Sequence, residues 1–189
     1  MRRRKIKRGI TAEKIIKTGE SLQRINAKQM EEEMTIQDEI FMKRAIELSR
    51  SAVRRGNEPF GAVLVKGGEI VFESENRIYT EHDPTYHAET GLIRDFCART
   101  GIADLKEYTL YSSCEPCFMC SGALVWVKLG RLVYGAGNAD LEHILGNEGN
   151  GCCETVFENS FWRPRVTSGI LREESIKVLE EYFSDHKKG

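Results

Sequence analysis

Apolar and polar residues follow two alternating patterns along the chain, one typical of helices and one typical of strands. From Gln37 onward, apolar residues recur on one helical face, and Gly56 is placed to end this helix. Two apolar runs, at 60–65 and 70–74, flank Gly67–Gly68 and predict a hairpin with a tight turn. The apolar positions of the first helix are Phe41, Ala45, Leu48 and Ala52.

The remaining chain alternates predicted helices with predicted strands. Helices are predicted over 87–99, over 116–129, around Thr155, and in a terminal amphipathic segment with Ile176, Leu179 and Phe183. Strands are predicted over 108–112, 131–135 and 165–170. A Gly/Asn-rich stretch at 147–151 is predicted to be a loop. Strands that alternate with helices indicate an α/β sandwich.

The first 35 residues differ from the rest of the chain in charge pattern. Basic residues open this segment, and Glu31–Glu33 close it. Charge blocks of this kind are usually solvated. We therefore predict a charged extension over residues 1–35, disordered or helical, and one compact domain over residues 36–189. A basic arm that touches RNA or a partner is the alternative interpretation. The opening basic residues are Arg2, Arg3, Arg4, Lys5, Lys7 and Arg8.

The overall composition favours an enzyme of small substrates. The chain has 189 residues with 40% hydrophobic side chains, enough for one packed core. No apolar run approaches the roughly 20 residues of a membrane helix, and no signal-peptide apolar region follows the basic start, so we expect a cytoplasmic protein without a membrane partner. The chain has 28 Lys and Arg residues against 29 Asp and Glu residues. It therefore lacks the bulk positive charge of a nucleic-acid binder.

Two short segments carry the candidate chemistry. His87-Ala88-Glu89 and the stretch 116–120 are each predicted at the first turn of a helix. Cys117 and Cys120 are spaced i, i+3, so they lie on one helical face, and His87 can complete a set of three protein ligands. Three protein ligands and one open position are typical of catalytic zinc, which lowers the pKa of a bound water from about 15.7 to about 7. The sequence therefore predicts one Zn²⁺ per chain.

Glu89 is the candidate catalytic residue. It follows His87 by two residues, so it points differently from the ligand and is placed beside the water rather than on the metal. There it would take the proton of the water and pass protons to the substrate nitrogen and the departing amine. Rival interpretations are a structural zinc half-site, a redox cysteine pair, or a site that includes Cys114. Cys114 lies in strand-end backbone, so its side chain need not share the helical face.

His-x-Glu combined with Pro-Cys-x-x-Cys is typical of zinc deaminases. Over about Glu39 to Phe183 the chain resembles the cytidine/deoxycytidylate deaminase superfamily, in particular the guanine/cytosine-type base deaminases and the tRNA adenosine deaminases. The matching residues are Pro59-Phe60-Gly61-Ala62-Val63, Asn76, His82-Asp83-Pro84-Thr85, His87-Ala88-Glu89 and Cys114-Glu115-Pro116-Cys117-Phe118-Met119-Cys120 with Ser121-Gly122-Ala123.

The resemblance implies a fold and a set of substrate contacts. It implies a three-layer α/β/α sandwich with a central mixed five-stranded sheet, and a homodimer whose subunits help to close each other's pockets. Asn76 would hydrogen-bond the substrate base, Phe60 would form a pocket wall, and the backbone of Ala88 would meet the reacting edge. An aromatic residue at the position of Trp126 helps to enclose a free base in the small-base deaminases, although a helical aromatic can equally be core.

The substrate signals conflict. The stretch from Tyr111 to Cys117 is similar to guanine deaminases, whereas Thr167–Ser175 resembles the end of bacterial tRNA adenosine deaminases. We expect a zinc-dependent hydrolytic deaminase of a free nucleobase, because the segment 135–151 lacks the loop expected of the tRNA enzymes. No C-terminal acidic residue aligns with the one that holds guanine, which leaves cytosine and isocytosine-like bases open. A tRNA-specific adenosine deaminase is the alternative. A non-enzymatic zinc module is disfavoured by the intact Glu89.

Overall fold

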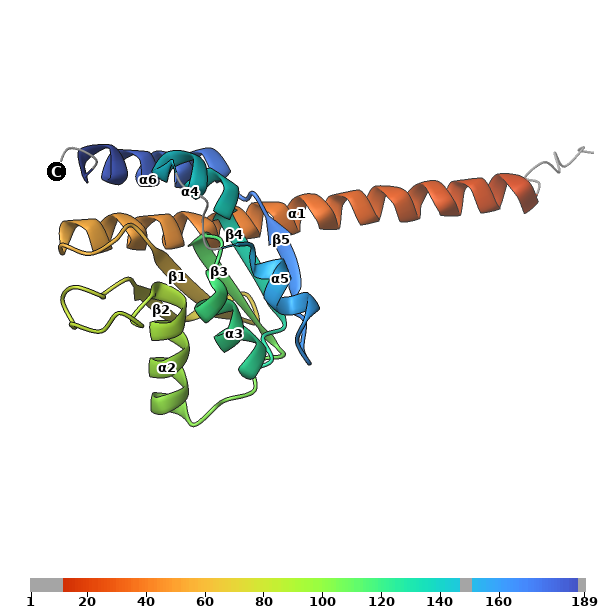
Figure 1. Cartoon of the computed structure of the whole chain (residues 1–189). Coiled ribbons are helices and arrows are strands. Elements are labelled where there is room, and N and C mark those ends of the chain that lie inside the picture. Colours follow the sequence, from red (N-terminus) through yellow and green to blue (C-terminus); the bar gives the residue numbers. More distant parts are fainter. Residues whose placement is uncertain (1–11, 147–150, 187–189) are drawn as a thin grey trace, which may run out of the picture. The chain divides into compact units, whose positions relative to one another are not determined.

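The computed structural model describes residues 12–146 and 151–186 of the chain (Figure 1). Contacts divide the chain into two units, one up to Gln37 and one over Asp38–Gly189. The first helix, α1, spans Ala12–Arg54, so it begins well before the apolar periodicity that starts at Gln37. Its N-terminal half is rich in Lys, Glu, Gln and Ala, which have high helix propensity. The basic residues before position 12 lie outside the described residues.

Five strands form one mixed sheet in the order β2-β1-β3-β4-β5. The pairs β1–β2 and β1–β3 are antiparallel, whereas β3–β4 and β4–β5 are parallel. The predicted mixed five-stranded sheet is therefore confirmed. The strands are β1 (Gly61–Lys66), β2 (Glu69–Glu75), β3 (Tyr108–Cys114), β4 (Arg131–Ala136) and β5 (Arg165–Ser168).

The helices after α1 follow the prediction with one addition. α4 is the helix that the apolar pattern does not predict, and polar contacts hold its start. The Asp140 carboxylate accepts the Gly137 N–H at 2.8 Å, and Glu115 accepts the Asn138 N–H at 2.8 Å. These helices are α2 (Ala88–Thr100), α3 (Phe118–Trp126), α4 (Asn138–Leu145), α5 (Cys153–Glu158) and α6 (Arg172–His186).

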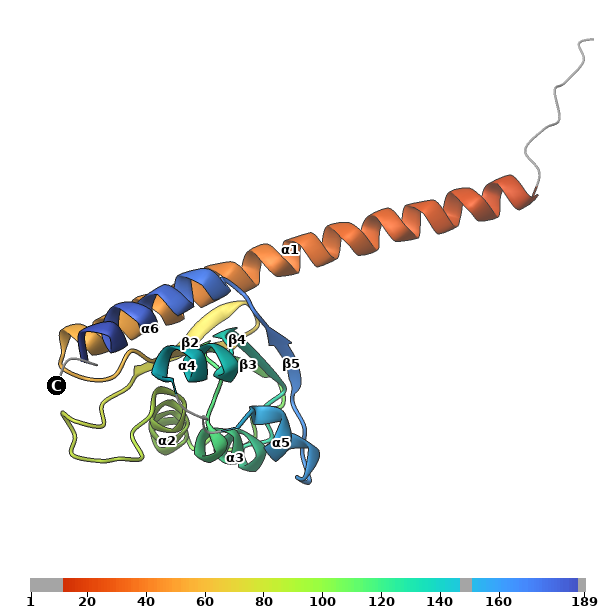
Figure 2. The same ribbon diagram turned by 45° about the horizontal axis from the view of Figure 1, so that its top comes forward.

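The sheet is covered on both faces, which gives the predicted three layers (Figure 2). Successive strand residues point to opposite faces, so Leu110 packs toward α2 and α3 while Tyr111 packs toward α1. Because both faces are buried, β1 reads as a continuous apolar run rather than an alternating one. One hydrophobic core lies between the sheet and helices α2, α3 and α5. The other lies between the opposite face of the sheet, residues 41–48 of α1 and Val178 of α6.

A buried ion pair ties α1 to the middle of the sheet. The two terminal guanidinium nitrogens of Arg131 donate to the Asp38 carboxylate, at 2.8 and 2.6 Å, and the Tyr111 hydroxyl donates to the same carboxylate at 2.7 Å. Burial and this contact raise the pKa of Tyr111.

Within the described ranges, no helix combines the length and the apolar character that crossing a lipid bilayer requires.

Candidate metal centre and active site

Two helix starts place the predicted metal ligands next to each other. His87 is the residue before α2, and Cys117 is the residue before α3; each has extended backbone and no side-chain cap. Cys120 follows in the first turn of α3 and is buried. α2 and α3 pack on the same face of the sheet, so the loops leading into them end side by side.

The three side chains have the spacing that a shared ion requires. Nδ1 of His87 lies 3.6 Å from the Cys117 sulfur and 3.7 Å from the Cys120 sulfur. All three donor atoms lie within 4.8 Å of one another. Tetrahedral bonds of about 2.3 Å to sulfur and about 2.0–2.1 Å to nitrogen separate the two donors by about 3.6 Å. The donor set therefore fits Zn²⁺, with Nδ1 as the imidazole donor.

The surroundings of the two cysteines favour the thiolate form of Cys117. A hydrogen bond from the Cys120 thiol and the contact with His87 lower the pKa of Cys117 to about 4. Cys120 remains the proton donor of the pair, so its own pKa is raised. The Cys117 thiolate in turn raises the pKa of His87. A dication bound here would displace the remaining protons and take the place of this hydrogen bonding.

Glu89 is a buried carboxylate within the same site. Its Oε1 accepts the Ser112 hydroxyl at 2.7 Å, and its Oε2 lies 3.3 Å from the Cys120 sulfur. Burial raises the pKa of Glu89, and the Ser112 hydrogen bond opposes this shift. A raised carboxyl pKa suits a group that must both accept and release a proton near neutral pH.

Cys114 belongs to a different part of the fold. It is buried with Ala136 and Leu179, toward α6. Burial raises its pKa, which keeps the thiol protonated. Among the described residues the potential metal-binding group consists of His87, Cys117 and Cys120 alone, without Cys114.

Asn76 offers a buried donor without a partner. Its backbone N–H donates to the Phe60 carbonyl at 2.9 Å, and its Oδ1 accepts the Ile78 N–H at 3.1 Å. Its Nδ2 has no hydrogen-bond partner among the described residues, although the side chain is fully buried. Phe60 is half-buried and packs against two of the core clusters. Ala88 is buried at the first position of α2, where the backbone N–H has no partner within the helix.

Trp126 lies at the other end of α3 from the cysteines. It ends the helix six residues after Cys120, about 9 Å along the axis at 1.5 Å per residue. Its side chain is 77% exposed and makes an edge contact with Phe161, with ring centroids 5.5 Å apart. It is therefore not a core residue of the described chain.

Two residues of the site were not predicted. Ser112 orients Glu89 through a hydrogen bond. It could have been identified from the sequence as a polar residue within a strand that is buried on both faces. Glu58 precedes β1; its carboxylate accepts the Tyr79 hydroxyl at 3.3 Å. Burial raises the pKa of Glu58, and the charge of His87 opposes this shift. No local pattern marks Glu58, because its neighbours come from distant loops.

Comparison with known proteins agrees with this geometry. Residues 35–136 match the family described as the cytidine and deoxycytidylate deaminase zinc-binding region. The guanine deaminase of Bacillus subtilis (strain 168) is 45% identical over 149 residues, which cover 78% of this chain and 88% of that enzyme. The tRNA-specific adenosine deaminase of the same strain is 35% identical over 157 residues, covering 80% of this chain and 92% of that enzyme.

A solved guanine deaminase from Nitrosomonas europaea shares the fold. Its TM-score is 0.68 at 26% sequence identity, and the alignment covers 77% of this chain and 84% of that one. The chain is thus similar to known deaminases over most of its length. It also has the metal-binding group, the buried Glu89 carboxylate and the mixed sheet described above. The chain belongs to the cytidine and deoxycytidylate deaminase family, whose members are zinc-binding enzymes that remove amino groups by hydrolysis.

Proposed function

We propose that this deaminase acts on a free nucleobase, with guanine or a guanine-like lactam preferred. In this proposal His87, Cys117 and Cys120 hold the zinc ion, and Glu89 moves the protons. The observation that carries it is the buried Glu89 carboxylate, 3.3 Å from the sulfur of Cys120 and hence beside the metal-binding group.

A zinc ion held by His87, Cys117 and Cys120 would supply a water whose proton is easily removed near neutral pH. Glu89 accepts that proton as the water oxygen attacks the carbon that carries the amino group. Glu89 then delivers this proton to the neighbouring ring nitrogen, takes the remaining proton from the hydroxyl group that has been added to the carbon, and passes it to the amino nitrogen, which leaves as ammonia. Ser112 keeps the carboxylate in one orientation through its hydrogen bond to Oε1. Water is consumed and the amino group is replaced by oxygen, so the reaction needs no further reactant.

Two polar groups of the site complement the lactam edge of guanine. The free Nδ2 of Asn76 is a buried donor for a ring carbonyl. In this proposal the Glu58 carboxylate accepts an adjacent ring N–H and takes the place of the C-terminal acidic residue that the sequence does not align. Adenine presents neither a carbonyl nor a ring N–H on its six-membered ring. Leaving a buried donor unpaired costs about 1–3 kcal/mol, which penalises adenine.

The tRNA alternative is less well supported by the described residues. The stretch 167–175, which is similar to tRNA deaminases, has a packing role here. Thr167 accepts a hydrogen bond from Arg131 at 3.0 Å, and Ile170 and Leu171 pack against the second core. The greater similarity to a guanine deaminase, 45% against 35% identity, supports the free-base proposal.

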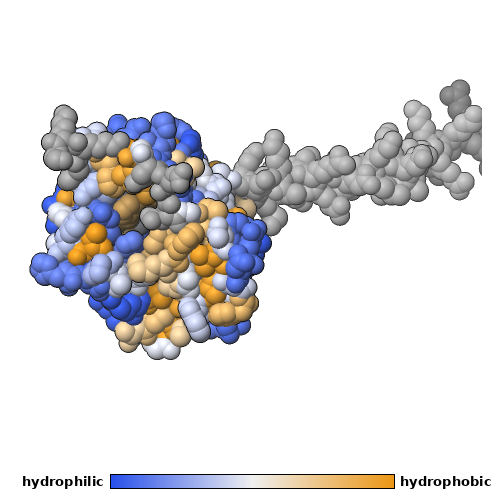
Figure 3. Space-filling view, viewed as in Figure 1, coloured by the Kyte–Doolittle hydropathy of each residue, from blue (hydrophilic) through white to orange (hydrophobic). Residues whose placement is uncertain are grey.

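We also propose that the chain forms a homodimer through the exposed side of α3. Phe118, Met119, Trp126 and Phe161 are all exposed. Figure 3 shows apolar side chains gathered on the face where α3 and α5 lie in Figure 1. Trp126 would then enclose the base bound in the neighbouring subunit rather than in its own. Sedimentation should show that Trp126→Glu shifts the protein from dimer toward monomer; an unchanged dimer would place the interface elsewhere.

The role of Glu89 is tested by Glu89→Ala with metal content measured in parallel. We expect about one zinc per chain as in the unaltered protein, and a loss of ammonia release on the order of 10²–10⁴-fold. Cys120→Ser is the matched variant and should lose both zinc and activity. Loss of zinc from Glu89→Ala would instead make Glu89 a structural residue.

The substrate is tested by an ammonia-release screen over guanine, isocytosine, cytosine, adenine, their nucleosides and tRNA. We expect ammonia release to be fastest with guanine and isocytosine. Glu58→Gln should raise KM for guanine more than for cytosine, which presents an acceptor nitrogen where guanine presents an N–H. Activity confined to tRNA would overturn the free-base proposal while leaving the deaminase chemistry intact.

A further inference from the structure

Tyr86 comes directly before the metal ligand His87, and its buried side chain packs along α2. The ring lies against Gly91, at the first turn of the helix: a Cβ atom added at Gly91 would lie 2.4 Å from Cε1 of the ring. The Tyr86 hydroxyl donates to Asp95 at 2.6 Å. Because Gly91 and Asp95 are one turn apart, the ring and the hydroxyl are both held on one face of α2.

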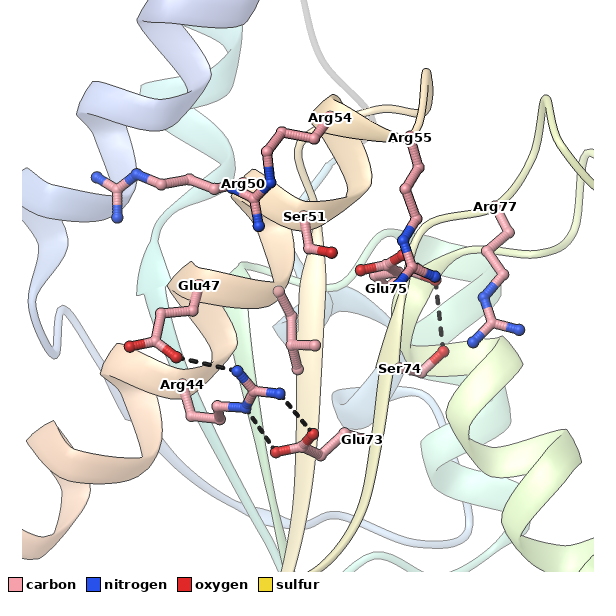
Figure 4. A pocket seen from close by; sticks show the side chains of 11 residues that line it. Arg44, Glu47, Arg50, Ser51, Arg54, Arg55, Glu73, Ser74, Glu75 and Arg77 are labelled. Carbon is pink, nitrogen blue, oxygen red and sulfur yellow. Dashed lines mark hydrogen bonds and ion pairs between the residues drawn. The ribbon is translucent and has the colours of Figure 1, made fainter.

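Two arginines complete the surroundings of the Tyr86 ring. The guanidinium carbon of Arg94 lies 4.3 Å from the ring centroid and that of Arg77 lies 5.2 Å from it, both within the range of a cation–π contact. Arg77 also donates to the Tyr86 hydroxyl at 3.2 Å. Arg77 follows β2, and Figure 4 shows it in the lining of the hollow between α1 and β2, separate from the arginines of α1. The ring is thereby tied to α2 and also to the segment after β2.

The backbone on both sides of Tyr86 is hydrogen-bonded as well. Its N–H donates to the Asp83 carbonyl at 3.0 Å, and its own carbonyl accepts the Arg77 N–H at 3.0 Å. The carbonyl of His87 accepts the Gly91 N–H at 2.8 Å, which closes the first turn of α2. Gly91 thus faces the Tyr86 ring and also holds the carbonyl of the metal ligand.

The neighbours Tyr86 and His87 contact different helices. The Tyr86 side chain contacts α2, whereas Nδ1 of His87 lies 3.6 Å from the Cys117 sulfur at the start of α3. His87 has extended backbone and no side-chain cap. The direction of its imidazole therefore depends on the backbone between Tyr86 and Gly91. Glu89 lies in the same turn, so the Tyr86 ring supports the segment that carries both the ligand and the candidate catalytic residue.

The glycine at position 91 is otherwise unfavourable within a helix. Glycine destabilises a helix interior relative to alanine. It is required at Gly91 because the Tyr86 ring occupies the place that a Cβ atom would take. A metal site gains from such packing when it fixes a ligand before the ion binds. Contacts that orient a metal ligand typically contribute about 10–100-fold to metal affinity.

We propose that Tyr86, packed on Gly91, is a positioning residue for the metal ligand His87. The ring fixes the direction in which the imidazole leaves the chain, so that Nδ1 faces the two sulfurs before the ion binds. Tyr86 acts through the backbone and touches neither the metal nor the substrate. This inference rests on the proposed metal ligation by His87 and not on the identity of the base.

Zinc affinity of the full chain, measured by competition with a chelator of known affinity, tests this role. Gly91→Ala should weaken zinc binding about tenfold, because the added methyl group displaces the ring. Tyr86→Ala should weaken it at least as much. In the double variant Tyr86→Ala/Gly91→Ala the methyl group has no ring to displace, so this variant should bind zinc as tightly as Tyr86→Ala alone. Such non-additive effects are expected of two residues in direct contact.

Tyr86→Phe keeps the ring and removes the hydroxyl, and Tyr111→Phe is its matched control. Tyr111 is also buried and donates to a carboxylate, that of Asp38, at 2.7 Å, on the face of the sheet opposite to α2 and α3. Tyr86→Phe should weaken zinc binding by a smaller factor than Tyr86→Ala, and Tyr111→Phe should leave it unchanged. Both variants lose a hydrogen bond to a carboxylate, so a shared fall in stability does not explain a difference in zinc affinity.

Cobalt(II) in place of zinc gives a second readout, because its visible absorption responds to the coordination geometry. The spectrum should change in Gly91→Ala and stay the same in Tyr111→Phe. If Gly91→Ala does not fold, the comparison of Tyr86→Phe with Tyr111→Phe carries the test.

The outcomes separate this inference from the proposed function. Additive losses of zinc affinity in the double variant would overturn the inference, as would equal losses in Tyr86→Phe and Tyr111→Phe. An unaltered chain that binds no zinc would overturn the proposed function together with it. An unaltered chain that binds one zinc as tightly as the Tyr86 and Gly91 variants would overturn this inference alone.

Discussion

Ser112 sets the proton affinity of Glu89, and its removal gives a measurable change in pH dependence. The Ser112 hydroxyl is buried and donates to Oε1 of Glu89 at 2.7 Å. This hydrogen bond favours the charged carboxylate and opposes the effect of burial, which raises the pKa. In Ser112→Ala this hydrogen bond is lost while burial and the charge of Cys117 still raise the pKa of Glu89, so that pKa should rise further.

The magnitude follows from the charge on the acceptor. A hydrogen bond to a charged group contributes about 1.5–3 kcal/mol. At 1.36 kcal/mol per pKa unit, its loss raises the pKa of Glu89 by about 1–2 units. Because Glu89 must be deprotonated to accept the first proton, the acidic limb of the kcat/KM profile should move upward by the same amount. At pH values above the acidic limb, kcat/KM of the variant should fall much less.

The assay is the pH profile of ammonia release for the unaltered protein and Ser112→Ala. Ser113→Ala is the matched control, since Ser113 is buried on the same strand and its oxygen accepts the Gly61 N–H at 3.1 Å instead. The control should leave the acidic limb in place. An acidic limb that stays unchanged or moves downward in Ser112→Ala would refute the assignment of Glu89 as the group that titrates.

Three further predictions concern stability and metal. Asp38→Ala should lower the free energy of unfolding by about 3–5 kcal/mol in urea denaturation, because it leaves the guanidinium of Arg131 unpaired where its side chain is 13% exposed; a loss below about 1 kcal/mol would contradict this. Gly130→Ala should destabilise by at least about 1–3 kcal/mol, since the added Cβ would lie 2.0 Å from the Lys106 carbonyl oxygen. Gly122→Ala is its control, with nothing within 4 Å, and should be neutral or stabilising. Removing zinc with a chelator should abolish ammonia release and lower the melting temperature, and added Zn²⁺ should restore both; full activity in metal-free protein would exclude the proposed role of the metal.

Local patterns predicted most elements and the metal-binding residues. Strands β1 and β3 are apolar runs bounded by turns, and the His-x-Glu and Cys-x-x-Cys spacings are properties of single helix starts. For that reason local patterns indicated an α/β sandwich and a zinc site, whereas the mixed five-stranded sheet and the three layers were implied by the resemblance to the deaminase superfamily. α4 was not predicted, because its start is held by Glu115, which lies 23 residues before Asn138.

Only the tertiary structure decided which polar groups surround the reacting position. Ser112 reaches the site because β3 is brought against α2, a contact that no short spacing encodes. The hollow between α1 and β2 is likewise lined by residues 44–55 and by Arg77, which are remote in sequence. Periodicity reports which side of an element is buried, whereas the partner of a buried hydrogen-bonding group depends on how distant elements pack. The sequence thus determined the chemistry of the site, and the packing determined its substrate-facing and proton-tuning neighbours.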